Sequence, residues 1–429
     1  MRALALVDGE HYPEVVRAAF AELSHDVVGA VLLGGGEKLR GVPDYGVPLH
    51  ADLAEGIEAS GAEVVVDLSD EPVVGPRTRF RLASRTLAAG VPYEGADFRF
   101  EPVPFAPLDV PALAVIGSGK RVGKTAVAGH AARLLARTRN VVVVAMGRGG
   151  PPHPVVTEAS PTVEDLLGLS RAGAHAASDY LEDAALAGVV TIGARRCGGG
   201  LAGRPFVSNV EEAARLAASL GPELMLLEGS GAAVPPVEAS RRILVAGAHQ
   251  DPETVAGYLG AYRLLISDLV VMTMAEEPLA TPAQVAAVRA AVADVTGIPV
   301  IAAVLRPRPV EPVAGSRVAV FTTAPGAIHE RLREHLEREH RAEVVLLSGN
   351  LARREDLRAE LDSRAARAAD TYLVEIKAAA IDVVAEAGSE RGIPVVFADN
   401  EVLPLEGEPD LDERIEALAA AATSERVLA

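Results

Sequence analysis

The stretch that most constrains the fold lies at residues 112–126, where an apolar run passes through a glycine-rich loop into an alanine-rich segment. The apolar run is typical of a buried strand, and Gly123-Lys124-Thr125 opens a predicted helix. A plain glycine turn that binds nothing is the alternative, but strand, loop and helix in this order favour a phosphate-binding P-loop. The residues expected at a bound nucleotide are Gly117, Ser118, Gly119, Arg121, Val122, Gly123, Lys124, Thr125 and Ala126.

Each part of such a loop has a chemical role. Glycines allow backbone N–H groups to turn inward around phosphate oxygens, and the start of the helix adds its positive dipole end. We expect Lys124 to reach the β- and γ-phosphates and Thr125 to offer its hydroxyl to Mg²⁺. Ser118 stands where the standard spacing has its first glycine. This longer loop resembles that of dethiobiotin synthetase and its relatives, whose extra early lysine would correspond to Lys120.

The composition restricts the partners of the chain. A net charge of −18 opposes binding to nucleic acid, because the phosphate backbone would be repelled. No apolar run is long enough to cross a bilayer, and Met1-Arg2-Ala3 leads straight into a predicted strand, so we expect a cytoplasmic protein without membrane partners. The single cysteine, Cys197, excludes an internal disulfide and fits a reducing compartment. An anionic substrate must then be held by local arginines and backbone amides.

The alternation of apolar runs and helical patterns predicts an α/β fold with a P-loop NTPase-like parallel sheet flanked by helices. We expect three units. They are a smaller N-terminal α/β domain at residues 1–107, with a substrate-binding role, a nucleotide-binding core at 108–325, and a C-terminal α/β segment at 326–429. The last would serve packing or the contacts of a homodimer. Four prolines between residues 102 and 111 indicate a linker at the first boundary.

Two further strands of the predicted core end in functional residue types. Residues 223–227 are predicted to form a strand that delivers Glu228 at its end, where P-loop enzymes place the acid that binds Mg²⁺. Thr125 and Glu228 are therefore the predicted metal ligands. The strand at residues 141–145 leads into a glycine loop that carries Arg148. Near a P-loop this arginine would face phosphate, although a plain turn is the alternative.

Five glycines and three arginines crowd residues 193–204. This composition suits backbone amides and forked guanidinium donors that close on a multiply charged anion. A second basic pattern places arginines every four residues from Arg77 to Arg85, on one face of a predicted helix. That face is either solvated or binds a polyanion. The substrate-binding candidates are Arg77, Arg81, Arg148, Arg195, Arg196, Gly198, Gly199 and Gly200.

Four stretches together resemble the cyclic 2,3-diphosphoglycerate synthetase family over nearly the whole chain. They are residues 8–13 (DGEHYP), 117–125 (GSGKRVGKT), 195–200 (RRCGGG) and 227–231 (LEGSG). The resemblance implies ATP-driven closure of 2,3-bisphosphoglycerate into an internal pyrophosphate, with release of ADP and phosphate, and with Mg²⁺ and K⁺ as cofactors. We expect Lys120, Lys124 and Glu228 to be catalytic. A substrate with about four to five negative charges suits the many arginines.

Two other functions stay open at this point. One is an ATP-dependent ligase of the dethiobiotin synthetase type, which activates a carboxylate as an acyl phosphate. The other is a nucleotide-switch ATPase that acts on a partner protein. The extra N-terminal domain and the arginine-rich loops count against the ligase, and the absence of a basic amphipathic tail counts against the switch.

Overall fold

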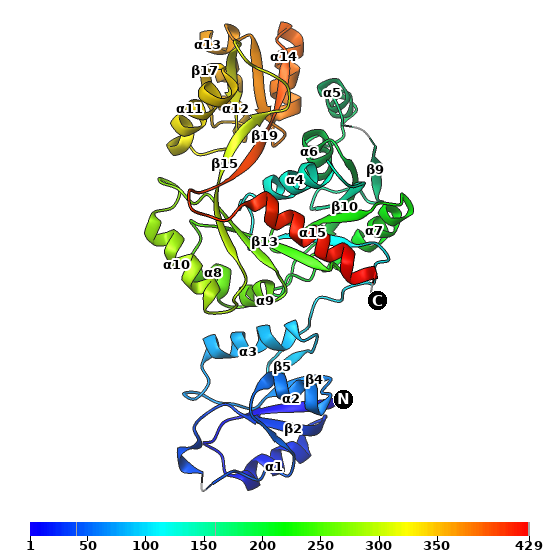
Figure 1. The fold of residues 1–429 in the computed structure, drawn as a ribbon, viewed down its shortest axis with the longest axis vertical. Helices are drawn as coiled ribbons and strands as arrows, with labels where there is room; N and C mark the ends of the chain where they lie inside the picture. The colour runs from blue at the N-terminus through cyan, green and yellow to red at the C-terminus, as the bar shows by residue number, and fades with distance from the viewer. Residues whose placement is uncertain (40, 159, 428–429) are drawn as a thin grey trace.

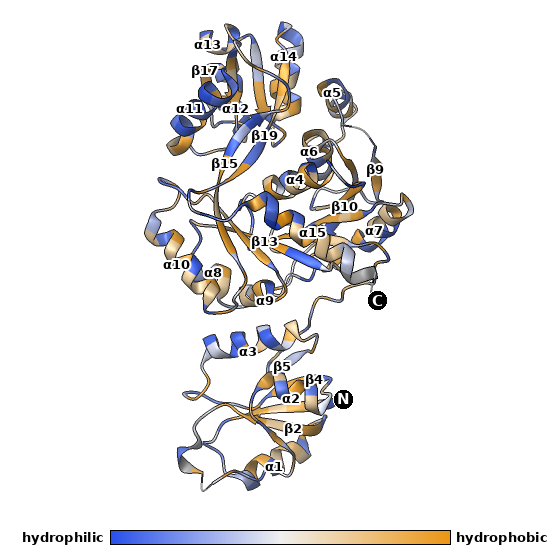
Figure 2. Ribbon diagram, in the orientation of Figure 1, coloured by the Kyte–Doolittle hydropathy of each residue, from blue (hydrophilic) through white to orange (hydrophobic). Residues whose placement is uncertain are grey.

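The computed structural model of the protein describes residues 1–39, 41–158 and 160–427. Three α/β units follow one another along its long axis, with the N-terminal unit at one end and the C-terminal unit at the other (Figure 1). Hydrophobic residues concentrate on the strands inside the units, and hydrophilic residues lie on outer helices such as α11 (His329–His340) and α12 (Arg354–Leu361) (Figure 2). The arrangement confirms the predicted α/β class. Within the described ranges, no helix has both the length and the apolar character needed to cross a membrane.

The N-terminal unit holds a sheet of six strands in the order β3-β2-β1-β4-β5-β6. Its strands are parallel except for β6, which runs antiparallel to β5. Its strands are β1 (Arg2–Val7), β2 (Asp26–Leu32), β3 (Leu49–His50), β4 (Val64–Asp67), β5 (Tyr93–Gly95) and β6 (Phe98–Phe100). Its helices are α1 (Pro13–Glu22), η1 (Gly36–Lys38), α2 (Leu53–Ser60) and α3 (Pro76–Ala88).

The core unit is built on the P-loop strand β7, which lies between β12 and β13 in a parallel sheet. Every residue of β7 and of β8 is buried, as expected for strands covered by helices on both faces. Its strands are β7 (Ala112–Gly117), β8 (Val141–Gly147), β9 (Val155–Thr157), β10 (Val190–Cys197), β11 (Val207–Ser208), β12 (Leu224–Glu228), β13 (Arg241–Gly247), β14 (Leu269–Thr273) and β15 (Val300–Pro309). Its helices are α4 (Lys124–Leu135), α5 (Val163–Arg171), α6 (Asp179–Ala187), α7 (Val210–Ser219), α8 (Pro252–Ala256), α9 (Gly260–Leu265) and α10 (Pro282–Ala293).

The core and C-terminal units share one sheet of 13 strands. The two parts join where β15 pairs antiparallel with β19 along its second half. The C-terminal strands are β16 (Arg317–Phe321), β17 (Glu343–Ser348), β18 (Thr371–Glu375) and β19 (Val395–Pro404). The helices between them are η2 (Gly326–Ile328), α11 (His329–His340), α12 (Arg354–Leu361), α13 (Arg364–Arg367), the π-helical turn η3 (Ala380–Ala385) and α14 (Glu386–Arg391).

Two boundaries differ from the expectation. Strand β16 pairs with β17 and β18, so the C-terminal unit already includes residues before 326. The last helix, α15 (Leu411–Val427), returns to the core and packs on β7 and α4. Its Asp412 accepts a hydrogen bond at 2.6 Å from His130 of α4. The proline-rich segment connects the N-terminal unit to the core and is also bound to the core. The backbone of Ala106 hydrogen-bonds to Pro236 at 3.0 Å and to Glu238 at 2.9 Å.

Candidate active site

The P-loop lies between the end of β7 and the start of α4. Arg121 and Gly123 both adopt left-handed backbone conformations, with φ of 59° and 76°, as in backbone turns that bind anions. A Cβ on Gly123 would lie 2.8 Å from Leu305 Cδ1, so this position has no room for a side chain. The N-cap residue of α4, Gly123, has no side chain to cap the helix, and the N–H groups of the first turn are therefore suited to an anion.

Side chains from neighbouring strands hold this loop in place. Ser118 Oγ donates to Gln250 Oε1 at 2.6 Å, and the same oxygen accepts from the backbone of Gly247 at 2.9 Å. Thr273 Oγ1 donates to the carbonyl of Val122 at 2.7 Å. Gln250 and Thr273 were not expected from the sequence. Gln250 follows β13, which lies beside β7, and Thr273 ends β14, which lies on the other side of β13. Only the sheet order reveals these places.

Glu228 lies at the end of β12, next to the P-loop strand, as predicted. It forms an ion pair with Lys124 and accepts a hydrogen bond from Thr125 Oγ1 at 2.9 Å. Burial works to raise the pKa of Glu228, but Lys124 and the other hydrogen-bond donors lower it overall. Its second carboxylate oxygen, Oε2, is buried and lacks a hydrogen-bond partner in the described part of the chain. A carboxylate oxygen beside a threonine hydroxyl is a donor set suited to Mg²⁺.

A row of acids on α6 faces the same place. Asp179, Glu182 and Asp183 follow the i, i+3, i+4 spacing and therefore share one helix face. Burial and the charge of Glu228 raise the pKa of Asp183 well above its usual range. The spacing was visible in the sequence. Only the packing of α6 against β8 and β10 shows that this face points inward.

The C-terminal unit adds a lysine to this cluster. Lys377 follows strand β18, and its Nζ lies 3.5 Å from Glu182 Oε1 of the core. The negative charge of Glu182 raises the pKa of Lys377, whereas burial raises that of Glu182 to about 8. The neighbouring Ala378 has a left-handed backbone with φ of 49°. The segment that presents Lys377 is therefore a specific, strained turn.

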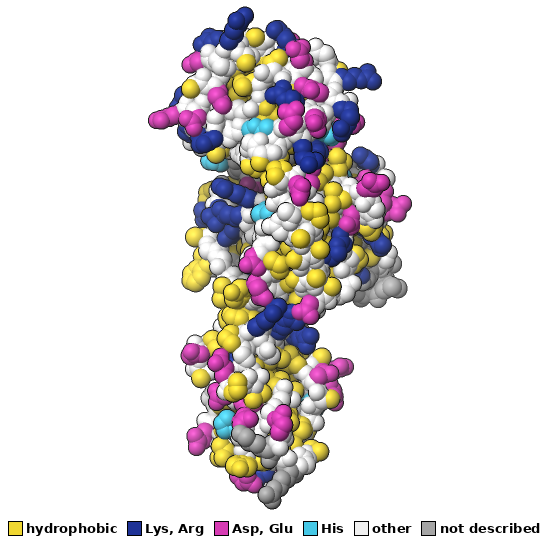
Figure 3. All heavy atoms as spheres, turned by 90° about the vertical axis from the view of Figure 1, so that its left-hand side faces the viewer, with side chains coloured by type: hydrophobic (Ala, Val, Ile, Leu, Met, Phe, Trp, Pro, Cys, Tyr) yellow, Lys and Arg dark blue, Asp and Glu magenta, His cyan; other side chains and the backbone are white. Residues whose placement is uncertain are grey.

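A cleft of about 880 Å³ adjoins the P-loop. Arg148 and Arg195 are both exposed in it, and neither side chain forms an ion pair within the described residues. Together with Lys120, these two arginines give the cleft the positive charge expected of an anion site. On the face shown in Figure 3, a group of Lys and Arg side chains lies on the middle part of the molecule. Its lining residues are Gly119, Lys120, Arg148, Arg195, Arg196, Cys197, Gly198, Gly199, Gly200, Val207, Gly231, Ala232 and Ala233.

Arg196 differs from its two arginine neighbours because it is buried, with 8% of its surface exposed. Its guanidinium donates to the carbonyl of Gly198 at 2.8 Å and to that of Ser230 at 2.8 Å. Burial and the nearby charge of Arg148 lower its pKa. Arg196 therefore joins the arginine-rich loop to the segment after Glu228, and this contact shapes the cleft wall.

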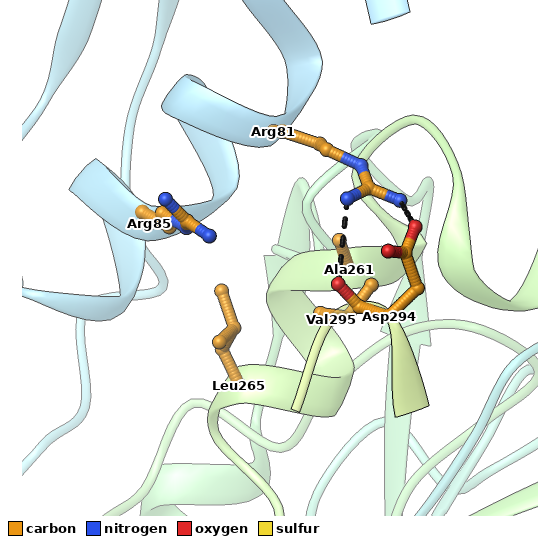
Figure 4. Close-up of a pocket in the computed structure, with 6 residues that line it drawn as sticks. All are labelled: Arg81, Arg85, Ala261, Leu265, Asp294 and Val295. Carbon is orange, nitrogen blue, oxygen red and sulfur yellow. Dashed lines mark hydrogen bonds and ion pairs between the residues drawn. The ribbon is translucent and has the colours of Figure 1, made fainter. Parts of the chain in front are cut away.

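The arginine row of α3 lies elsewhere. Arg77 pairs with Glu253 of α8 at 3.0 Å, and Arg81 pairs with Asp294 beyond the end of α10. Figure 4 shows Arg81 reaching across to Asp294, with Arg85 nearby on the same helix. Neither Arg77 nor Arg81 lines the cleft beside the P-loop. The structure instead places this row at the junction of the N-terminal and core units, where α3 packs on α9.

A parallel sheet with this loop, an uncapped helix start and a buried acid on the adjacent strand defines a P-loop nucleotide-binding protein. The chain belongs to the cyclic 2,3-diphosphoglycerate synthetase family, because three domains of that family match it in order. The N-terminal domain matches residues 2–101, the P-loop domain residues 112–304 and the C-terminal domain residues 309–401. The predicted family and the predicted class of enzyme, a synthetase, are confirmed.

Similar proteins carry the same name. The cyclic 2,3-diphosphoglycerate synthetase of Rubrobacter xylanophilus is 54% identical over 94% of both chains, and that of Thermococcus gammatolerans is 45% identical over 94% of both. Among solved structures, LpxK from Aquifex aeolicus in complex with ATP superposes with a TM-score of 0.44 and 14% identity, covering 74% of this chain and 90% of that one. This TM-score and this identity are too low to assign a function.

Proposed function

We propose that this protein closes 2,3-bisphosphoglycerate into cyclic 2,3-diphosphoglycerate with consumption of ATP. The observation that carries this proposal is the shared cleft, in which Lys120 of the P-loop and the arginine-rich loop line one space. A γ-phosphoryl group held by the P-loop would lie at the mouth of a site rich in hydrogen-bond donors for anions. The names of the relatives support the same reaction.

The first step is transfer of the γ-phosphoryl group to one phosphate of the substrate, which forms an anhydride and leaves ADP. Lys124 and Lys120 neutralise the charge that develops on the transferred group. Thr125 and the free oxygen of Glu228 would hold Mg²⁺, which supplies charge neutralisation at the β- and γ-phosphates. K⁺ stays an expectation from the family resemblance.

The second step closes the ring. An oxygen of the other substrate phosphate attacks the substrate phosphorus that carries the new anhydride, and inorganic phosphate leaves. Arg148 and Arg195 hold the two substrate phosphates at a short separation, so that the attack becomes effectively unimolecular. Positioning and charge neutralisation therefore dominate, and little proton transfer is required.

Lys377 is a positioning residue in this scheme. Its ammonium lies at the acid row of α6, and the positive charge limits the repulsion between these carboxylates and an anionic substrate. The segment after β18 would thus make the site depend on the C-terminal unit. The homodimer stays a prediction, which sedimentation of the purified protein would test.

The test is ³¹P NMR of the protein with ATP, Mg²⁺, K⁺ and 2,3-bisphosphoglycerate, beside a Lys124→Ala variant. We expect new phosphorus-coupled signals distinct from those of ATP and ADP, absent with the variant. Phosphate release that needs a small carboxylic acid but gives no coupled product would indicate a ligase of the dethiobiotin synthetase type. ATP hydrolysis without any small acid would indicate a nucleotide switch.

A further inference from the structure

Two histidines and a glutamate meet in the C-terminal unit, outside the site described above. His335 and His340 both come from the last turns of α11, and Glu401 comes from β19. One ring nitrogen of each histidine and one carboxylate oxygen of Glu401 all lie within 4.8 Å of one another. His335 Nε2 is 3.8 Å from Glu401 Oε2. The three side chains thus converge on one point from two elements.

The histidines lack the partners that buried polar groups require. His335 is 3% exposed, and the Nε2 atoms of His335 and His340 are both buried without a hydrogen-bond partner in the described part of the chain. A buried polar atom that makes no hydrogen bond destabilises the folded protein. Two such atoms beside one carboxylate indicate that a further species belongs between them.

A cation at this cluster would be opposed by nearby positive side chains, and Arg306 is one of them. Arg306 is itself engaged by Glu276, to which its Nη2 donates at 2.8 Å. The positive charge closest to the cluster is therefore partly balanced.

We propose that His335, His340 and Glu401 bind one zinc ion, with water as the fourth ligand. Two imidazole nitrogens and one carboxylate oxygen are donors that zinc accepts in tetrahedral geometry. Mg²⁺ prefers sites made only of oxygen, so this site is distinct in chemistry from the one at Glu228. The ligand atoms need to close by less than 1.5 Å, since tetrahedral ligands lie roughly 3.3 Å apart.

The place of the site explains what the ion would do. Glu401 pairs with Arg306 in the β15–β19 ladder, which joins the core sheet to the C-terminal strands. Bound zinc would connect the end of α11 to β19, the strand that the C-terminal unit contributes to this ladder. The ion would stabilise the fold and take no part in phosphoryl transfer.

The test uses the full chain without a histidine tag, stripped by a chelator and kept in excess Mg²⁺ to occupy oxygen-only sites. Co²⁺ is the probe, because its visible absorption reports coordination by imidazole. We expect one equivalent to bind and Zn²⁺ to displace it. His340→Asn and Glu401→Gln should each weaken binding by more than about tenfold, the loss that even an outer-shell change causes. His329→Asn, on the same helix, is the matched control.

A second readout guards against variants that fold poorly. Zn²⁺ should raise the thermal unfolding midpoint of the unmodified chain and of His329→Asn, but should leave those of His340→Asn and Glu401→Gln unchanged. The proposal is overturned if Co²⁺ binds equally well to all four proteins, or if no ion binds the unmodified chain. Neither result would bear on the synthetase reaction, which depends on the separate P-loop site.

Discussion

The ammonium of Lys377 lies 3.5 Å from the carboxylate of Glu182, so the C-terminal unit and the core meet in an ion pair beside the P-loop. Lys377 is one of only four lysines in the chain. The pair lies in a cluster that also contains Lys124 and Asp179. The charge of Lys124 acts on Asp179, and the charge of Asp179 acts on Glu182. Through this contact, a unit that lacks the nucleotide motif would influence the proposed phosphoryl transfer.

Lys377→Ala should therefore lower kcat/KM for 2,3-bisphosphoglycerate by roughly 10- to 100-fold, the worth of one charge-assisted hydrogen bond. Lys377→Arg should recover part of the loss because it restores the charge. Steady-state kinetics would measure both, with Arg367→Ala as a control from the same unit that pairs with Asp362 on the surface. Unchanged kinetics in Lys377→Ala would remove this residue from the mechanism.

Arg148 and Arg195 should act on the acid substrate more than on the nucleotide. Each Arg→Ala change should raise the KM for 2,3-bisphosphoglycerate by about tenfold or more while the KM for ATP changes little, because a charge-assisted hydrogen bond to one substrate is lost. Arg215→Ala, an exposed arginine of α7 that pairs with Glu211, serves as the control. An equal rise in both KM values would place these arginines at the nucleotide instead.

Arg196 should behave differently from Arg195 next to it. Removal of its guanidinium leaves the buried carbonyl of Ser230 without its donor, so Arg196→Ala should lower the free energy of unfolding by about 1–3 kcal/mol. Urea denaturation would measure this change, with Arg195→Ala as the comparison, since Arg195 is exposed. Equal stability of the two variants would contradict a structural role for Arg196.

Two adjacent glycines offer a further test of the cleft wall. A Cβ on Gly150 would lie 2.0 Å from the carbonyl oxygen of Ala194, whereas a Cβ on Gly149 would meet no atom within 4 Å. Gly150→Ala should push the loop that carries Arg148 away from β10. The free energy of unfolding should fall by about 1–3 kcal/mol, and the KM for 2,3-bisphosphoglycerate should rise. Gly149→Ala should stay within about 0.5 kcal/mol of the unmodified protein. Thermal unfolding and steady-state kinetics of both variants would measure these differences.

Local sequence patterns predicted the nucleotide half of the site. Strand, loop and helix are continuous in the chain, and Glu228 follows its own strand directly, so each could be recognised without knowledge of the sheet. The family resemblance supplied the reaction. Arg148 and Arg195 were expected at the substrate, and the structure brings both to the cleft.

The rest depends on contacts that no local pattern encodes. Lys377 follows β18, in the unit that the β15–β19 ladder joins to the core, and meets Glu182 across the chain. Asp183 lies near Glu228 because α6 turns its acid face toward β12. The arginines of α3 show the limit of periodicity. Their spacing predicted a shared helix face correctly, but only the packed structure shows Glu253 and Asp294 opposite them.

Helix α15 determines when the nucleotide-binding core can be completed. Leu411, Ile415 and Ala419 of this helix fill the same apolar cluster as Val127 of α4 and Val115 of β7, although the whole C-terminal unit separates them in the chain. On the ribosome, the apolar surface that α4 and β7 present to α15 therefore stays uncovered until residues 411–427 emerge. A nascent chain that stalled before this point would expose that apolar face, and it would be a substrate for chaperones rather than a partly active enzyme.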